Sequence, residues 1–321
     1  MRDLVTVFGG SGFIGSQVVR ALAKKGLRIR IAVRQPHLAG AQRLHGDVGQ
    51  IEIVQANVRD SASVRRALEG ASACVNLVGI LYEHGRQRFE AVHAQGATIV
   101  AQAARDAGVG RFVQMSALGA DPASPSAYAR SKAAAEAAVR GIIPTATILR
   151  PSIVFGAEDD FFNRFAAMAV VAPALPLIGG GQTRFQPVYV GDVAQAVVAG
   201  ITDPATAGRT FELGGPAVFT FRELMQIVLD ETGRRRALVP LPAPLASAVG
   251  AVAQLASGLF APPVTPDQVR LLARDNVVSQ GADGLEALGI APTALEGVVG
   301  TYLYRYRKGG QYADQTGLQT V

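Results

Sequence analysis

The chain has 321 residues, of which 49% are hydrophobic and 17% charged, with a net charge of +6. This apolar fraction excludes a disordered chain, and the length suits one large α/β domain with a smaller lobe. The single cysteine excludes an intramolecular disulfide and a cysteine metal cluster, and the absence of Trp with only 6% aromatic residues argues against nucleic-acid binding by stacking.

Apolar strands alternate with helical segments through the first 151 residues. Strands are predicted at residues 4–8, 28–33, 51–56, 73–79, 111–116 and 145–151, and helices at 11–25, 63–70, 86–107 and 126–139. Apolar strands that alternate with helices form a parallel sheet with helices on both faces. We therefore predict an α/β fold with a Rossmann doubly wound parallel sheet and a smaller C-terminal α/β lobe.

The pattern is less regular after Arg150. Thr220, followed three residues later by Glu223, has the spacing of a capping box, and Gly233 is typical of a helix end, so residues 220–233 are predicted to be helical. We predict an NAD(P)-binding domain over residues 1–233, in which residues 150–233 are shared with the small lobe. Residues 234–321 are predicted to form a C-terminal helical lobe and a polar tail that acts as a docking segment.

One long segment, residues 237–264, carries no charge. Pro244 and Pro262 enclose about seventeen residues, fewer than the roughly twenty that span a bilayer, so no transmembrane span is expected. Two interpretations remain open: a helix packed in the small lobe, or a surface that lies on a membrane or a membrane protein. We expect a cytoplasmic protein, with peripheral contact to the inner face of the cytoplasmic membrane in the second interpretation.

A glycine triplet opens the first predicted helix, in the sequence FGGSGFIG. Glycines at this turn allow a sharp bend and let the backbone approach a pyrophosphate, which the positive helix end attracts. The triplet follows a strand, as the dinucleotide-binding pattern requires. The predicted phosphate-binding residues are Gly9, Gly10, Ser11, Gly12, Phe13, Ile14 and Gly15.

The choice of nucleotide depends on the residue after the second strand. An acidic side chain there would bond the ribose 2′-hydroxyl of NAD, but this chain has Arg34, which suits the 2′-phosphate of NADP. A solvated arginine, or one that stacks on adenine, is the alternative. NADP(H) is therefore the preferred cofactor and NAD(H) the second choice. Asn57 and Val58 are expected near adenine, and Leu77, Val78 and Gly79 near the ribose and nicotinamide.

The predicted catalytic residues are Tyr128, Lys132 and Ser116. Tyr128 and Lys132 are four residues apart and share one helix face. A nearby ammonium and the nicotinamide charge lower the pKa of a phenol, and the lysine can also hold the ribose hydroxyls. Ser116 ends the fifth strand, where it could bond a substrate carbonyl or be satisfied by the backbone.

These motifs resemble the short-chain dehydrogenase/reductase superfamily, including its extended and atypical branches. NLVGILYE, RFVQMSALGAD, YARSKAAAE, LRPSIVFGAEDDFFNRFA and QPVYVGDVA are most similar to the nucleotide-binding accessory subunit of respiratory complex I and its bacterial relatives. The resemblance implies a tightly held, structural NADP(H), with Tyr128 and Lys132 on the nicotinamide ribose. It also implies that Pro151, Ser152 and Ile153 cover the nicotinamide.

Two functions follow from these residues. The first is an NADP(H)-binding accessory subunit or assembly factor of complex I, an NADH:quinone oxidoreductase. The second is an active NAD(P)-dependent reductase, dehydrogenase or epimerase/dehydratase-like enzyme on an apolar carbonyl or quinone. Asn57 stands where the superfamily has Asp, and the loop between Ser116 and Tyr128 is short for a nucleotide-sugar site. A sugar-nucleotide epimerase or a redox sensor therefore fits less well, and no metal site is predicted.

Overall fold

The computed structural model describes residues 3–242, 265–310 and 312, which form two compact units. The first unit comprises Met1–Pro151, Val190–Leu213 and Val278–Ala291, and the second comprises Ser152–Tyr189, Gly214–Val277 and Pro292–Val321. The sequence boundary at Gly233 does not coincide with this division. The chain leaves the first unit after its sixth strand and returns to it twice. A single boundary along the sequence therefore cannot separate the two units.

A seven-stranded parallel sheet forms the centre of the first unit, in the order β11-β6-β5-β4-β1-β2-β3. Its strands are β1 (Leu4–Phe8), β2 (Arg28–Val33), β3 (Ile51–Gln55), β4 (Ala73–Asn76), β5 (Arg111–Met115), β6 (Thr147–Pro151) and β11 (Thr210–Leu213). The strand order reverses between β1 and β4. This is the point at which doubly wound sheets bind dinucleotides, so the predicted fold class is confirmed.

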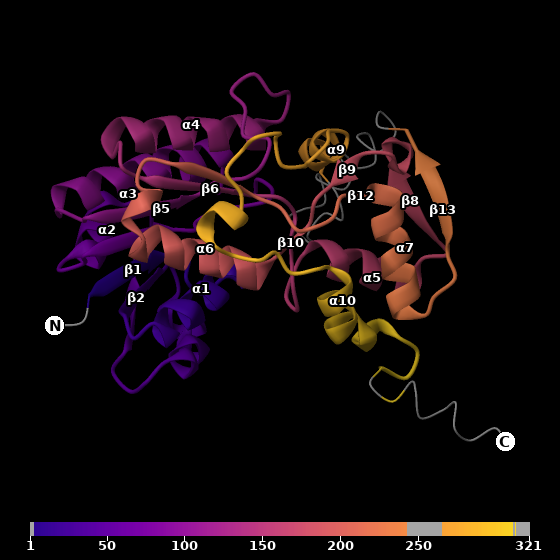
Figure 1. The fold of residues 1–321 in the computed structure, drawn as a ribbon, viewed down its shortest axis with the longest axis horizontal. Helices are drawn as coiled ribbons and strands as arrows, with labels where there is room; N and C mark the ends of the chain where they lie inside the picture. The colour runs from indigo at the N-terminus through magenta and orange to yellow at the C-terminus, as the bar shows by residue number, and fades with distance from the viewer. Residues whose placement is uncertain (1–2, 243–264, 311, 313–321) are drawn as a thin grey trace. The chain divides into compact units, whose positions relative to one another are not determined.

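Helices cover both faces of this sheet (Figure 1). They are α1 (Phe13–Lys24), α2 (Ser61–Leu68), α3 (Gln95–Asp106), α4 (Ala127–Ile142) and α6 (Val190–Thr202), with a π-helical turn η3 (Glu90–Ala94) before α3 and short 3-10 turns η1 (Pro36–Leu38), η2 (Gly40–His45), η5 (Pro204–Thr206) and η6 (Glu286–Leu288). Helices α2, α3 and α4 pack side by side on one face, while α1 packs against α6 on the other.

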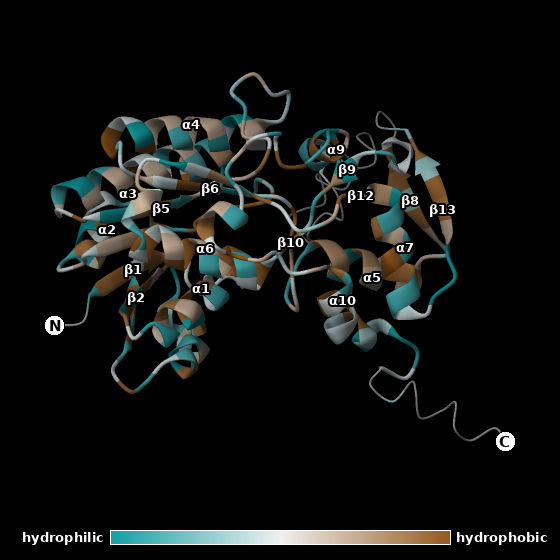
Figure 2. Cartoon of the chain, in the orientation of Figure 1, coloured by the Kyte–Doolittle hydropathy of each residue, from teal (hydrophilic) through white to brown (hydrophobic). Residues whose placement is uncertain are grey.

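The core of the first unit is apolar because the strands are nearly continuous hydrophobic runs. Phe8, Phe112 and Ile148 from the sheet pack with Val100 of α3 and Val139 of α4, all buried. Figure 2 shows hydrophobic residues along the central strands, and helices in which hydrophobic and hydrophilic residues alternate. Burial on both faces of a parallel sheet requires this pattern.

The second unit combines helices with short strand pairs. Its helices are α5 (Phe161–Val171), α7 (Phe221–Thr232), α9 (Pro266–Leu272) and α10 (Glu296–Leu303), with 3-10 turns η4 (Gly179–Gly181) and η7 (Tyr304–Tyr306). Its strand pairs are β8 (Ala174–Ile178) with β13 (Ala237–Leu241), β7 (Val154–Phe155) with β10 (Val188–Tyr189), and β9 (Arg184–Phe185) with β12 (Phe219–Thr220). The predicted capping box of Thr220 and Glu223 begins α7, and Gly233 ends it in the left-handed region.

Part of the uncharged segment forms β13, while its residues 243–264 and the tail residues 313–321 lie outside the described residues. Both interpretations of the segment between Pro244 and Pro262, and the docking tail, therefore stay predictions. In the part of the chain that the structure describes, no helix combines the length and apolarity that a bilayer crossing needs.

Candidate functional site

The glycine loop packs directly against the start of α1. Gly9 has a φ of +79°, which L side chains rarely adopt, and the Gly12 N–H donates to the Gly9 carbonyl at 3.1 Å. A Cβ on Gly15 would lie 2.2 Å from the Gly9 oxygen and 2.7 Å from the Gly10 Cα. The tight turn and the helix–strand contact thus each require glycine.

The first turn of α1 is open to a ligand. Gly12 is its N-cap, and among the described side chains none caps it. A Cβ on Gly12 would meet only the Gly9 oxygen within 4 Å, at an ordinary 3.5 Å. Uncapped N–H groups at a helix N-terminus attract phosphate. With exposed Ser11 beside it and partly buried Phe13 and Ile14 following, this turn fits the pyrophosphate of a dinucleotide.

The predicted adenine side contains one exposed cation and one structural amide. Arg34 is exposed at the end of β2. The Asn57 side-chain oxygen accepts the Arg59 N–H at 3.1 Å, and the Ser63 hydroxyl accepts the Asn57 N–H at 3.0 Å. Asn57 therefore stabilises the turn after β3, and the neighbouring Val58 side chain is buried. Contact of either residue with adenine stays a prediction.

The end of β4 is fixed by three hydrogen bonds. The Leu77 N–H donates to the Phe8 carbonyl at 3.0 Å, and the Val78 N–H donates to the Asn76 side chain at 3.2 Å. The Asn76 amide in turn donates to Gln114 at 2.9 Å. At Gly79 a Cβ would lie 3.4 Å from the Lys132 Nζ, so Leu77, Val78 and Gly79 run toward that lysine.

Tyr128 and Lys132 lie together on the inner face of α4. The Lys132 Nζ is 5.7 Å from the centre of the Tyr128 ring and donates to the Met115 carbonyl at 3.4 Å. Burial raises the pKa of Tyr128 to about 12. Burial also lowers the pKa of Lys132 to about 8, although the Glu136 carboxylate acts in the opposite direction. At neutral pH Tyr128 is therefore a phenol that can donate a hydrogen bond, beside a cation.

Lys132→Met is expected to stabilise the cofactor-free protein at pH 7 while weakening dinucleotide binding. The pKa of Lys132 is lowered from 10.5 to about 8, and at 1.36 kcal/mol per pKa unit the buried ammonium costs up to about 3 kcal/mol. Between pH 8 and 10.5 the unfolded chain retains a proton that the folded chain has lost, so wild-type stability rises and the gain of Lys132→Met shrinks.

Urea denaturation of both proteins from pH 7 to 10.5 measures this difference. The exposed Lys24→Met variant is the control and should stay within about 0.5 kcal/mol of wild type at every pH. A Lys132→Met protein that is less stable than wild type at pH 7 would show that Lys132 contributes to folding rather than to the site.

The Ser116 hydroxyl donates to the carboxylate of Glu136, a buried residue one turn after Lys132 on α4. Arg150 holds the same carboxylate through its Nε at 2.9 Å and its Nη2 at 2.7 Å, and its Nη1 lies 3.4 Å from Glu212. These carboxylates raise the pKa of Arg150. Ser116 thus has a side-chain partner within the protein, and its role toward a substrate carbonyl stays a prediction.

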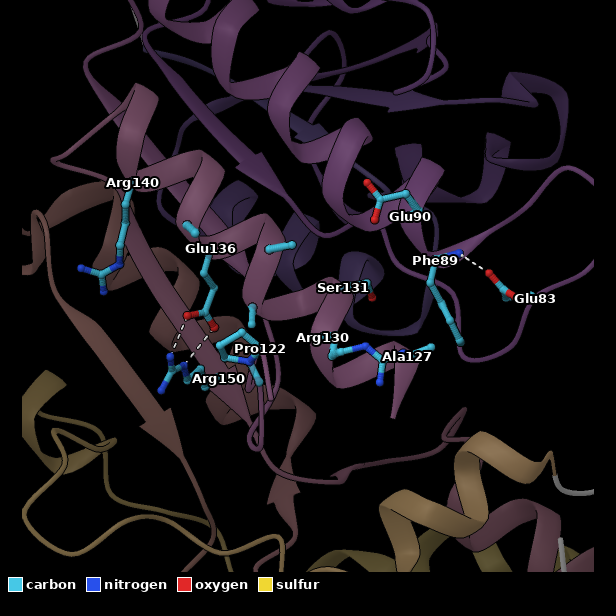
Figure 3. A pocket seen from close by; sticks show the side chains of 14 residues that line it. Glu83, Phe89, Glu90, Pro122, Ala127, Arg130, Ser131, Glu136, Arg140 and Arg150 are labelled. Atoms are coloured by element: carbon cyan, nitrogen blue, oxygen red, sulfur yellow. Dashed lines mark hydrogen bonds and ion pairs between the residues drawn. The ribbon is translucent and has the colours of Figure 1, made fainter. Parts of the chain in front are cut away.

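A hollow of about 710 Å³ lies on the outer side of α4 in the first unit (Figure 3). The Glu136–Arg150 pair lines one side, and Glu83, which accepts the Phe89 N–H at 2.8 Å, lines the other. Alanines of α4 form part of the wall between them. Because its lining includes no residue of the glycine loop, this hollow is separate from the predicted pyrophosphate site.

The three residues predicted to cover the nicotinamide fall in both units. Pro151 ends β6, and its carbonyl accepts the Leu118 N–H at 2.9 Å. In the second unit the Ser152 hydroxyl donates to the Asn276 side chain at 2.7 Å, and the Ile153 carbonyl accepts the Val188 N–H at 2.9 Å. Their position over a nicotinamide stays a prediction.

Sequence reasoning missed His93, Glu136 and Arg150. The buried His93 contacts Ile80 and Ser131, 13 and 38 residues away, while Arg150 is 14 residues from Glu136 and 62 from Glu212. Two features of the sequence could have indicated these residues. Lys132 and Glu136 have i, i+4 spacing on one helix, and His93 is a single histidine before an apolar helix. Within residues 3–242, 265–310 and 312, no cluster of ligand side chains could hold a metal ion.

The chain was compared with known protein families, curated proteins and solved structures. Residues 5–214 match the NAD dependent epimerase/dehydratase family. The chain is 39% identical over 316 residues to NADH dehydrogenase (ubiquinone) 1 alpha subcomplex subunit 9, mitochondrial, of Arabidopsis thaliana, covering 96% of this chain and 79% of that protein. It is 31% identical to a ceramide reductase of Caulobacter vibrioides, covering 80% of each. A dTDP-glucose 4,6-dehydratase of Streptomyces venezuelae shares the fold, with a TM-score of 0.71 at 22% identity over 99% of both chains.

Proposed function

Because the chain belongs to the NAD dependent epimerase/dehydratase family, we propose that it is an NADP(H)-binding accessory subunit or assembly factor of respiratory complex I. The tight glycine loop and the uncapped start of α1 carry this proposal, while the hydroxyl of Ser116 donates to Glu136 within the protein. The similarity over 96% of the chain to a protein named as a subunit of NADH dehydrogenase supports it. The protein then lies peripherally on the inner face of the cytoplasmic membrane.

In this function the chain's residues hold the cofactor. The N–H groups of α1 bind the pyrophosphate, and Arg34 binds the 2′-phosphate. Tyr128 and Lys132 donate hydrogen bonds to the nicotinamide ribose, beside the backbone at Gly79. The bound nucleotide supplies a hydride-transferring ring, but a structural role requires only that it stays bound and joins the carboxyl ends of β1, β2 and β4.

Purification of the tagged chain from detergent-solubilised native membranes tests this function. We expect complex I subunits to co-purify and NADP(H) to be released on denaturation. A preparation without complex I subunits, from membranes in which complex I is assembled, would contradict the accessory role. A preparation that contains no nucleotide and takes up no NADPH would contradict the cofactor assignment.

Arg34→Glu is expected to weaken NADPH binding by about a hundredfold, because it replaces a cation that pairs with the 2′-phosphate by an anion that repels it. NADH lacks this phosphate, so its affinity should change by about threefold or less. Titration of both nucleotides by fluorescence measures the two affinities. Arg43→Glu, at an exposed position of η2, is the matched control. Equal losses for NADPH and NADH would remove Arg34 from the 2′-phosphate site.

The Tyr128–Lys132 pair favours a second function, an active NAD(P)-dependent reductase. Similarity to a protein named ceramide reductase points to an apolar carbonyl substrate. Tyr128 would then donate its phenol proton to the carbonyl oxygen as hydride arrives from the cofactor. NADPH consumption with long-chain ketones or quinones, abolished by Tyr128→Phe, would establish this function. Complex I assembly that survives Tyr128→Phe but fails in Gly12→Asp would favour the accessory role.

A further inference from the structure

His93 lies where the end of β4 meets α4. Its Nε2 is 2.9 Å from the Ile80 nitrogen, and its Nδ1 is 2.8 Å from the Ser131 hydroxyl. A backbone N–H can only donate, so Nε2 must accept, and the proton of a neutral imidazole is then on Nδ1. The Ser131 hydroxyl accepts a hydrogen bond from this Nδ1–H and donates one to the Tyr128 carbonyl at 2.7 Å. One tautomer therefore satisfies the whole chain of hydrogen bonds.

The surroundings keep His93 uncharged. Only 2% of its surface is exposed. Burial, and after it the nearby Lys132 ammonium, lower the pKa of His93 to about 2. Protonated His93 would also present an Nε2–H to the Ile80 N–H, two donors facing one another. Geometry and electrostatics thus exclude the imidazolium at this position.

Ring packing fixes the orientation of the imidazole. Phe89 stacks on His93 with ring centres 5.4 Å apart and 28° between planes, and Tyr128 meets it edge-on at 5.4 Å and 86°. A Cβ on Gly79 would lie 3.6 Å from the His93 Nε2. His93 itself belongs to the π-helical turn η3, a local widening of the helix that is frequent at functional sites.

We propose that His93 is a positioning residue of the dinucleotide site. As the Nδ1–H tautomer it joins the backbone at Ile80 to α4, which sets the distance between the β4 end and Tyr128. Both groups can then contact the nicotinamide ribose together. This role deepens the proposed function and rests on it, since a dinucleotide must bind for the positioning to matter.

Nitrogen-15 NMR of the imidazole in the full-length, cofactor-free protein tests the tautomer directly. We expect an unprotonated Nε2 and a protonated Nδ1 throughout the range from pH 5 to 9. Protonation of Nε2 at any pH in this range would overturn the proposal. This measurement needs neither a variant nor bound nucleotide.

Two substitutions test the positioning. His93→Leu removes the acceptor of the Ile80 N–H and should weaken NADPH binding by about tenfold, while the Ile80 amide exchanges with solvent faster. His93→Gln can place a side-chain oxygen near the Ile80 N–H and should recover most of the affinity. His37→Leu, on the exposed turn η1, should leave both unchanged.

The outcomes separate this proposal from the proposed function. Wild-type affinity in His93→Leu would overturn the positioning role, as would an equal loss in His93→Gln and His93→Leu. A wild-type protein that takes up no dinucleotide would instead overturn the proposed function. In that case the tautomer and the exchange of Ile80 still decide whether His93 holds the β4 end.

Discussion

Gly15→Ala is expected to destabilise the first unit and to abolish dinucleotide binding. The added Cβ would lie 2.2 Å from the Gly9 carbonyl oxygen and 2.7 Å from the Gly10 Cα. Both are main-chain atoms of the loop that joins β1 to α1, so no side-chain rotation relieves the contact. Either the loop or α1 must shift, and we expect the free energy of unfolding to fall by about 3 kcal/mol or more.

Gly12→Ala is the matched control, because it adds the same methyl group to the same loop. At Gly12 the new Cβ would be 3.5 Å from its nearest neighbour, so stability should change by about 1 kcal/mol at most. Urea denaturation followed by circular dichroism measures both variants, and NADPH titration measures binding. A Gly15→Ala protein with the wild-type denaturation midpoint would show that α1 does not need this close approach.

The six strands expected in the first half of the chain are confirmed as β1 to β6. Their signal is local, since each is a short apolar run closed by a turn or a helix. Strand β11 was not predicted because it has four residues, includes Glu212, and is recruited by pairing with β6 across 62 residues. The division into two units was missed for the same reason. It depends on which later segments return to the first unit, and the hydrophobic periodicity of a segment carries no information about that.

The residues of the candidate site also fall into two groups, those that local sequence predicts and those that depend on tertiary contacts. The glycine loop and the Tyr128–Lys132 pair were predictable, because each depends on spacing within one turn or one helix. His93 and the Arg150 network join residues that are distant in sequence, and single polar residues in apolar segments do not identify their partners. Ser116 combines both kinds of information. The sequence predicted its position at a strand end, but the hydrogen bond from its hydroxyl to Glu136 depends on tertiary packing.

Arg150→Met is expected to lower the free energy of unfolding by about 3 kcal/mol or more, because it leaves a buried carboxylate without its counter-charge. The Glu136 side chain is 7% exposed and bonds to Arg150 at 2.7 Å. Arg184→Met is the control, because its pair with Asp275 has the same 2.7 Å separation while its side chains are 60% and 40% exposed. Exposed pairs contribute about 0–1 kcal/mol.

The double variant Glu136→Gln with Arg150→Met separates charge from packing. An amide in place of Glu136 still accepts the Ser116 hydroxyl but carries no charge, so the double variant should recover about half or more of the loss in Arg150→Met. Urea denaturation at pH 7 measures the whole cycle. Equal losses in the single and double variants would mean that the packing of the Arg150 stem stabilises this region. Recovery would instead show that the role of Arg150 is to neutralise the charge of the buried Glu136 carboxylate.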